Sequence, residues 1–174
     1  QRQMCIRDRL FSSGKMEDLS FAIDISGILP QQDSVVGLVA FPSQTKSILI
    51  KKFRRKFSRF WTQKGKSLKR KNLYEILSFL DENNVKMVGV KCTKFNWMRR
   101  FSNLPKNASY KREKLYGILY FLALKEVSKK GRIYDVVVCK DTFMNIDKAL
   151  IACKKLADYY EFNYNFNLSS GDFN

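Results

Sequence analysis

The last part of the sequence contains a strand pattern, a helix pattern and a second strand pattern, and this order restricts the fold more than any other feature. The apolar run "YDVVVC" precedes a helix with a single apolar stripe, and "FNYNFNL" follows it with asparagine alternating with apolar residues. Two strands joined by a helix predict a parallel pair with a right-handed connection. Asn145 can cap this helix, and its stripe comprises Ile146, Ala149, Leu150, Cys153, Leu156, Ala157 and Tyr160.

Three short apolar runs near the start predict an antiparallel meander of strands. They cover Leu19 to Ile25, Val35 to Phe41 and Ser47 to Phe53, and turn residues such as Gly27 and Pro42 lie between them. In the first run Phe21, Ile23 and Ile25 share one side, and Asp24 points to the other. The side of the strand that carries this carboxylate has room for a charged ligand.

Two helices and a strand connect the meander to the last part of the chain. The strand is "VKMVGVKC", and Ser109 and Gly131 can begin and end the second helix. The first helix is expected to place Leu73, Ile76, Leu77 and Leu80 on one face and to end at Asn83 and Asn84. The second helix is expected to point Leu115, Ile118, Leu119, Leu122 and Val127 inward. The complete order predicts an α/β fold with a mixed sheet.

The N-terminal stretch "QRQMCIRDRL" has no periodicity that joins it to the rest, and it resembles translated sequencing-adapter read-through. A disordered basic arm is the alternative. We therefore expect residues 1–15 to lie outside a single domain at 16–174, with Met16 as a plausible start. No run approaches the roughly 20 apolar residues of a membrane span, and no signal peptide is recognisable, which predicts a cytoplasmic protein without an integral membrane segment.

The sequence contains no histidine, which excludes Ser-His-Asp and Cys-His catalysis and the commonest transition-metal ligand. Cys92, Cys139 and Cys153 form no C-x-x-C pair, so we expect buried core thiols rather than a zinc site or disulfides. The remaining option for catalysis is carboxylate chemistry. Asp and Glu can hold Mg²⁺ or Mn²⁺ against phosphate oxygens without any histidine.

Positive charge is concentrated in one segment of a chain with a formal net charge of +17. Lys46 to Lys71 contains twelve Lys or Arg and no acid. Within it, Phe53, Phe57, Phe60 and Trp61 follow helical spacing. The aromatic side could pack on the sheet while Lys51, Lys52, Arg54, Arg55, Lys56 and Arg59 face phosphates, the rings could stack on bases, or the segment could lie on an anionic membrane.

A second basic stretch, "KCTKFNWMRRF", follows the strand "VKMVGVKC". It contributes Lys91, Lys94, Arg99 and Arg100, and it lies at the same end of the sheet as Asp24 if the two strands are parallel. The two basic stretches together would form a positive surface suited to a phosphate backbone. A dispersed, solvated lysine-rich surface is the alternative.

"FAIDISG", followed after a turn by "SVVGLVAF", resembles the opening of ribonuclease H-like families whose first strand ends Asp-Glu-Ser-Gly, and it is most similar to the uncharacterised family "domain of unknown function 3800". The resemblance extends loosely to Leu168 and includes "VVVCKD". It implies a ribonuclease H-like mixed sheet and a metal-dependent nuclease site in which Asp24 and Asp141 are catalytic metal ligands. Ile25 replaces the family glutamate, and the absent final helix predicts a C-terminally truncated chain, although "SSGDFN" could be a natural tail.

Two carboxylates seldom suffice for a pair of metal ions about 4 Å apart, so a third ligand is needed from Glu75, Glu113, Asp147 or a missing C-terminal segment. If the strand "VKMVGVKC" lay between the other two, the backbones at Asp24 and Asp141 would be roughly 10 Å apart. Glu75 and Glu113 lie among basic residues, for which surface pairing is the simpler role. Asp135 should face water at the start of its strand.

Three hypotheses about function follow from the sequence. The first is an Mg²⁺- or Mn²⁺-dependent nuclease-like protein acting on the phosphodiester backbone of nucleic acid. The second is a non-catalytic basic nucleic-acid-binding module on the same fold, which the isoleucine at position 25 favours. The third is a peripheral membrane or protein-interaction domain that uses the aromatic and cationic segment.

Overall fold

The computed structural model describes residues 18–29, 31–60, 68–94, 96, 109–140 and 143–169. Strands and helices alternate after an initial pair of strands. The elements are β1 (Leu19–Ser26), β2 (Ser34–Pro42), the short 3-10 helix η1 (Ser43–Thr45), α1 (Lys46–Lys56), α2 (Arg70–Glu82), β3 (Lys86–Cys92), α4 (Ser109–Val127), β4 (Ile133–Cys139), α5 (Ile146–Tyr159) and β5 (Asn163–Ser169).

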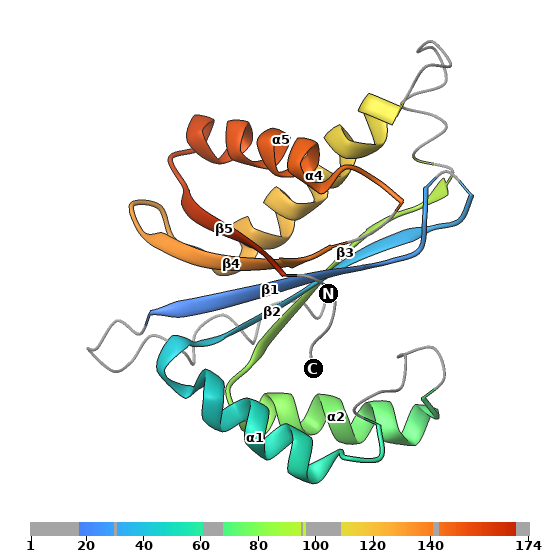
Figure 1. Ribbon diagram of the computed structural model, residues 1–174, viewed down its shortest axis with the longest axis vertical. Helices are drawn as coiled ribbons and strands as arrows, with labels where there is room; N and C mark the ends of the chain where they lie inside the picture. The colour runs from blue at the N-terminus through green and yellow to red at the C-terminus, as the bar shows by residue number, and fades with distance from the viewer. Residues whose placement is uncertain are drawn as a thin grey trace, which may run out of the picture.

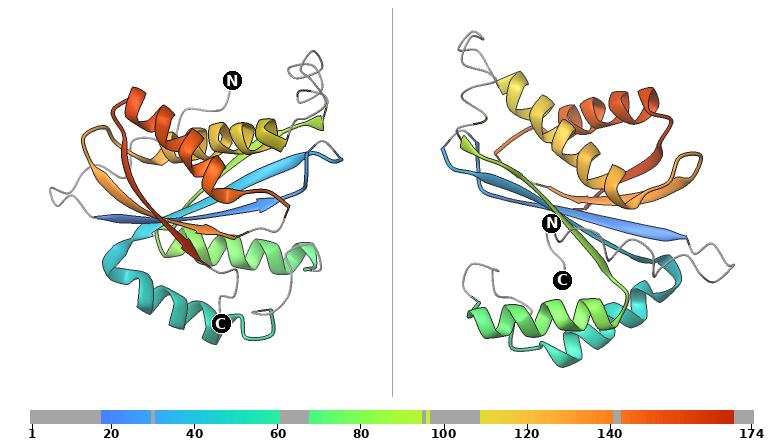
Figure 2. Two further views of the ribbon diagram at one scale, coloured as in Figure 1. Left: turned by 45° about the horizontal axis from the view of Figure 1, so that its top comes forward. Right: turned by 180° about the vertical axis from the view of Figure 1, so that it is seen from behind.

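The strands form one mixed sheet with the order β3-β2-β1-β4-β5. β1, β2 and β3 pair antiparallel, whereas β4 pairs parallel with both β1 and β5. Helices α4 and α5 cover one face of the sheet, and α1 and α2 lie on the other (Figure 1). The two further views in Figure 2 show the same three layers. The predicted α/β mixed sheet is confirmed.

The core lies between the sheet and the α4–α5 layer. Phe21 and Ile23 of β1 point into it together with residues of β2 and β4, and Asp24 points to the opposite face and is exposed. Helices α4 and α5 approach closely at Gly117, where an added Cβ would lie 2.5 Å from the Ala149 carbonyl oxygen. The alternation expected for β1 is therefore confirmed.

The expected strand at Ser47 to Phe53 is wrong, because this segment belongs to helix α1. Its apolar residues are not separated by the polar alternation of a half-buried strand, and Phe53 and Phe57 have the spacing of one helical face. The third strand of the meander is β3, which pairs with β2 after the α1–α2 segment has returned the chain to the sheet.

The expected position of the strand "VKMVGVKC" between the two acid-bearing strands is also wrong. This strand is β3, and it occupies the sheet edge beside β2. β1 instead pairs directly with β4, with Ile23 opposite Val138. The reason is that β2 is already adjacent to β1 on one side, so the connection through α4 reaches the free side of β1.

The apolar faces of the helices follow the sequence pattern to different degrees. On α5 the stripe is buried except at Leu156, which is partly buried, and Tyr160, which is exposed, and Asn145 caps the helix by accepting a hydrogen bond from the Lys148 backbone N at 3.1 Å. On α4 Leu122 is exposed. On α2 the buried residue is Phe79, whereas Leu73 and Leu77 are 38% and 46% exposed. The face of α2 is set by aromatic contacts with α1 that helical periodicity within α2 does not reveal.

Candidate nucleic-acid interface

Asp24 lies near the carboxyl end of β1, on the sheet face opposite the core. Its Oδ1 accepts a hydrogen bond from the backbone N of Ile25 at 2.8 Å. Gly37 of β2 lies directly beside it, and Gly89 of β3 lies beside Gly37. Both glycines are exposed, so no side chain of these two strands covers the carboxylate. Asp24 therefore stands on an open part of the sheet face among the residues that the structure describes.

The carboxyl end of β4 lies immediately next to Asp24. Ile23, the residue before Asp24, pairs with Val138, the residue before Cys139, so β1 and β4 are neighbouring strands at the usual spacing of about 4.8 Å rather than the roughly 10 Å expected with a strand between them. Asp141 follows Cys139 by two residues and lies outside the described residues. The sheet thus brings the ends of both acid-bearing strands to one edge.

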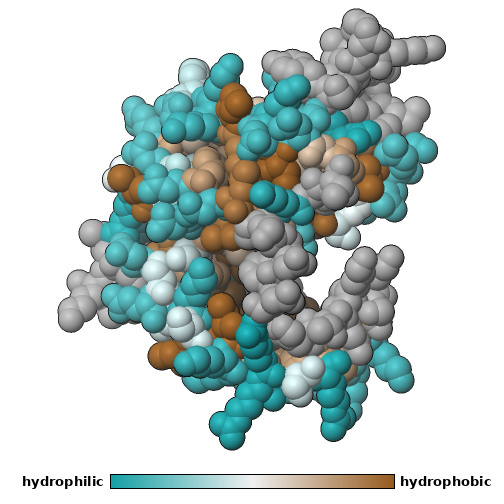
Figure 3. Space-filling view, in the orientation of Figure 1, coloured by the Kyte–Doolittle hydropathy of each residue, from teal (hydrophilic) through white to brown (hydrophobic). Residues whose placement is uncertain are grey.

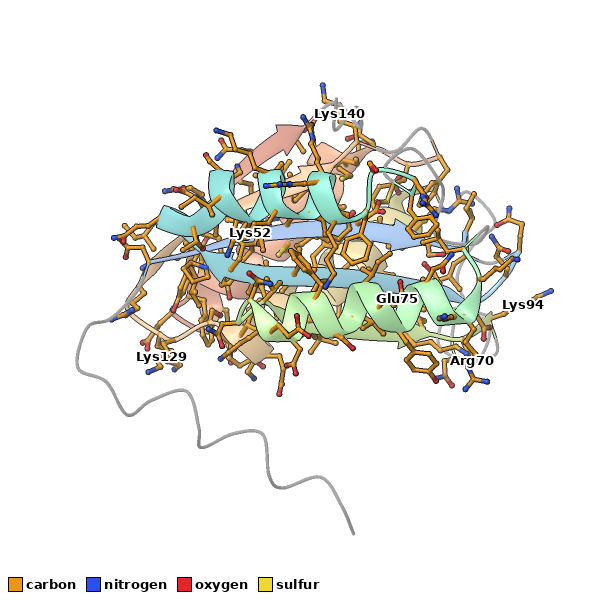
Figure 4. All side chains as sticks on the ribbon, turned by 90° about the horizontal axis from the view of Figure 1, so that it is seen from below. Lys52, Arg70, Glu75, Lys94, Lys129 and Lys140 are labelled. Carbon is orange, nitrogen blue, oxygen red and sulfur yellow. The ribbon has the colours of Figure 1, made fainter. Side chains whose placement is uncertain are left out.

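The acids proposed as a third metal ligand are spread over the fold. Glu75 is exposed on α2, as Figure 4 shows, and Asp147 is exposed in the first turn of α5. Asp135 is exposed at the start of β4, as predicted. Within the described ranges no three acidic or cysteine side chains come together as a metal site would require.

Surface pairing, the simpler role considered for Glu113, is wrong because its side chain is buried at 6% exposure. Oε1 accepts a hydrogen bond from the backbone N of Asn145 at 3.3 Å, and Oε2 has no hydrogen-bond partner among the described residues. The neighbouring Arg112 donates from Nη1 to the Phe143 carbonyl oxygen at 3.0 Å. The start of α4 therefore holds the connection between β4 and α5. No signal in the sequence revealed this, because Glu113 lies among basic residues that are typical of a helix surface.

Helix α1 carries half of the basic residues that the sequence singled out. Its cations are exposed, and the first turn contains no acid. In Figure 3, hydrophilic residues lie over both the upper part of the molecule and the lower part, where α1 lies. The exposed cations are Lys51, Lys52, Arg54, Arg55 and Lys56, followed by Arg59 after the helix.

The aromatic side of α1 packs on α2. Phe79 of α2 contacts Phe53 with ring centroids 5.7 Å apart and Phe57 with centroids 5.4 Å apart. Phe57 is 2% exposed and Phe79 is 5% exposed. Rings buried to this degree offer no face to a base. The rings of Phe57 and Phe79 therefore lie between the two helices, while the cations of α1 remain exposed.

A cleft of ≈ 450 Å³ lies between α1 and α2. Figure 4 shows the two helices side by side on one face of the sheet, with Lys52 on α1. Lys56 Nζ lies 5.2 Å from the centroid of the Phe79 ring, an arrangement that favours a fixed ammonium position. The lining residues are Lys52, Arg55, Lys56, Phe79, Glu82 and Asn83.

The second basic stretch begins at the end of β3, which runs parallel to β1 as expected. Lys91 Nζ forms an ion pair with Asp33 Oδ2 at 2.9 Å, and the backbone N of Lys94 donates to Asp33 Oδ1 at 2.8 Å. These contacts, first the Lys94 N–H and then the Lys91 ammonium, lower the pKa of the Asp33 carboxyl. The charge of Lys91 is thus partly neutralised. Arg99 and Arg100 lie outside the described residues.

Comparison of the structure with known folds agrees with this topology. No family model and no curated protein matches the sequence. A chain in the structure of the PCNA:RNase HII complex from Archaeoglobus fulgidus aligns with a TM-score of 0.52, 10% sequence identity and 87% coverage of this chain. A mutant of Bst-RNase HIII aligns with a TM-score of 0.48, 12% identity, and coverage of 88% of this chain and 46% of that chain. The fold is ribonuclease H-like.

The aligned part spans 62% of the first of these chains. At such low identity the similarity is one of fold. The ribonuclease H-like fold places the carboxyl ends of β1 and β4 together, and the functional residues of this chain have to be argued from its own side chains.

The cysteines of this ribonuclease H-like sheet differ in burial. Cys153 on α5 is buried, and desolvation raises the pKa of its thiol to about 12. Cys92 and Cys139 are only half-buried, so the expectation of core thiols is confirmed for Cys153 alone. Desolvation, and next the negative charge of Asp33, raise the pKa of Cys92.

Proposed function

We propose that this protein binds the phosphodiester backbone of nucleic acid through α1. The observation that carries the proposal is the set of exposed cations on one helix without a neutralising acid. Lys51, Lys52, Arg55 and Lys56 form no ion pair with an acid in the part of the chain that the structure describes. Lysine and arginine that replace counterions at phosphates supply most non-specific affinity for nucleic acid.

Fluorescence anisotropy with labelled DNA and RNA oligonucleotides tests this proposal. Replacing Lys51, Lys52, Arg55 and Lys56 together by glutamine should weaken binding by more than tenfold and flatten its salt dependence. A matched control replaces Lys154 and Lys155, two exposed cations of α5 on the opposite layer of the fold. Equal losses in both variants, or salt-independent binding, would contradict the proposal. Partitioning onto anionic vesicles without any nucleic-acid binding would favour a membrane-surface role instead. None of the helices among the described residues is both long and apolar enough to cross a membrane.

A second candidate function is metal-dependent hydrolysis of the same backbone, and the adjacency of β1 and β4 favours it. Asp24 is exposed at that edge, and Asp141 follows β4 by two residues in sequence. Carboxylates are suitable ligands for Mg²⁺ or Mn²⁺. The described residues alone do not complete such a site, since no three acidic or cysteine side chains among them form a cluster. No catalytic step through a metal is derived for them.

The nuclease candidate is tested by incubating DNA, RNA and hybrid substrates with Mg²⁺ or Mn²⁺. Cleavage should stop with a chelator and in both Asp24→Asn and Asp141→Asn. The matched control is Asp135→Asn, an exposed acid on the same sheet that should retain activity. Cleavage that survives in Asp24→Asn would eliminate this edge as the active site. If a chain extended beyond residue 174 bound nucleic acid but did not cleave it, only the binding function would be supported.

A further inference from the structure

We infer that the cleft between α1 and α2 binds a phosphate of single-stranded nucleic acid, and that Lys52, Arg55 and Lys56 are the residues that contact it. This inference rests on the proposed nucleic-acid binding by α1. It adds the location of a defined site and the class of nucleic acid that fits it.

The cleft brings three cations of α1 together on one side of the helix. Lys52, Arg55 and Lys56 are spaced i, i+3 and i+4, so their side chains start from one side of the helix about 5–6 Å apart. Three cations at this spacing can reach one phosphate or two successive ones. Lys51, in contrast, is exposed and does not line the cleft.

The wall opposite these cations is rigid and apolar at its base. Phe79 is buried and contacts Phe53 and Phe57 through its edge. Lys56 Nζ lies over both Phe57 and Phe79, at 5.6 and 5.2 Å from the ring centroids. Rings that are themselves packed hold this ammonium in place, which lowers the entropy lost when a phosphate binds.

The remaining lining residues distinguish a single strand from a duplex. Glu82 supplies a carboxylate, and Asn83 donates its Nδ2 to the Phe79 carbonyl oxygen at 2.8 Å. The Asn83 Oδ1 is consequently directed away from that bond and can accept. A carboxylate repels a ligand that offers phosphates alone, but it can accept a hydrogen bond from an N–H group on the Watson–Crick edge of an unpaired base, such as N3–H of thymine. A nucleotide with a phosphate and an accessible base edge can interact with the cations on one side of the cleft and with Glu82 and Asn83 on the other.

The size and position of the cleft agree with a single strand. Its volume of ≈ 450 Å³ lies in the range of small-molecule sites of about 300–1,000 Å³. α1 and α2 lie side by side on the sheet (Figure 4), so α1 does not stand apart as a helix that enters a major groove about 12 Å wide.

The experiment compares two double variants that remove the same charge. Lys52→Gln with Lys56→Gln alters the cleft, and Lys46→Gln with Lys71→Gln alters exposed positions of α1 and α2 outside it. Binding of a labelled single-stranded oligo(dT) and of a duplex of equal length is measured from about 50 to 200 mM salt. Circular dichroism verifies that both variants fold.

For the cleft variant we expect the salt slope for oligo(dT) to fall by about 1.4 and the affinity at 0.1 M salt to fall by about 25-fold, the effect of two phosphate contacts on a single strand. The other variant should lose threefold or less, and the wild type should prefer the single strand to the duplex. Equal losses in the two variants, or a preference for duplex, would overturn the cleft site and leave the proposed binding function intact. A wild type that binds neither oligonucleotide would overturn both.

Discussion

The two helical layers of this protein pack on the same sheet in opposite ways. α4 and α5 meet through small residues, with Gly117 against Ala149 and Cys153, and they enclose the main core. α1 and α2 meet through three phenylalanines and expose a row of cations. One layer therefore stabilises the sheet, and the other presents charge to solvent. The difference indicates that substitutions in the first layer should affect folding, whereas those in the second should mainly affect binding.

Gly117→Val should cause the largest loss of stability and would most strongly confirm the structural role of the α4–α5 layer. An added Cβ would lie 2.5 Å from the Ala149 carbonyl oxygen and 2.7 Å from the Ala152 Cβ, so the helices would have to separate. Overpacking of this kind should cost about 3 kcal/mol or more of unfolding free energy in urea titrations. Gly89→Val is the control, because its Cβ would meet only Val35 Cγ1 at 3.8 Å. Equal stability of the two variants would contradict the close approach of α4 and α5 at Gly117.

Phe79→Ala tests whether the second layer depends on its aromatic cluster. The substitution removes the ring that contacts both Phe53 and Phe57, and it should lower the free energy of unfolding by about 2 kcal/mol. Leu77→Ala on the same helix, at a position that is 46% exposed, should have a much smaller effect. Protection of the α1 amides in hydrogen exchange should decrease only in Phe79→Ala. Unchanged protection would show that α1 is held by other contacts.

Alkaline pH should weaken the α4–α5 layer first. Burial raises the pKa of Cys153 from 9.0 to about 12, so the folded state keeps the thiol protonated while the unfolded chain ionises. The stabilisation is complete below pH 9 and is lost as the pH rises toward 12. Ionisation of the unfolded thiol alone should lower the stability by about 1.4 kcal/mol at pH 10.

The measurement is urea unfolding at pH 7, 9 and 10 for the wild type and for Cys153→Ala. The variant should lose less stability between pH 7 and pH 10 than the wild type, whatever its stability at neutral pH. Cys92→Ala serves as the control, because that thiol is only half-buried. Identical pH profiles for the wild type and Cys153→Ala would contradict the burial of this thiol.

Asn145→Ala should have a moderate effect on the start of α5. Its side chain accepts from the Lys148 backbone N, and loss of such a cap costs about 1 kcal/mol. Asn145→Asp keeps the acceptor and should retain most of the stability, as measured by thermal unfolding. A similar loss in both variants would assign the effect to the Glu113 contact with the backbone of this residue rather than to the cap.

Lys52→Gln should have the smallest effect on stability. It should distinguish most clearly the role of the α1–α2 layer in binding from the role of the α4–α5 layer in folding. The residue is exposed and forms no ion pair with a described acid, so its replacement should alter the unfolding free energy by no more than about 0.5 kcal/mol. Binding of oligo(dT) should nevertheless weaken about fivefold at 0.1 M salt. A loss of stability comparable to that of Phe79→Ala would show that the cations of α1 also hold its fold.

Local sequence patterns predicted some positions well and others poorly. Alternation in β1 placed Asp24 on the open face, and the stripe and cap of α5 are present as predicted. The strand predicted at Ser47 to Phe53 is wrong because a short apolar run has no reliable period by itself. The surface pairing predicted for Glu113 is wrong because a charged residue among lysines resembles a surface residue until the loop that covers it is known.

The sequence by itself determined the α/β class, the open side of β1 and the concentration of charge between Lys46 and Lys71, since periodicity and composition are local properties. Only the tertiary structure decided that β4 lies against β1, that Phe79 links α1 to α2, and that a cleft forms beside Lys52. These features depend on contacts between segments far apart in the chain. Strand order and helix docking are selected by the total burial of many side chains, which no single stretch of sequence specifies.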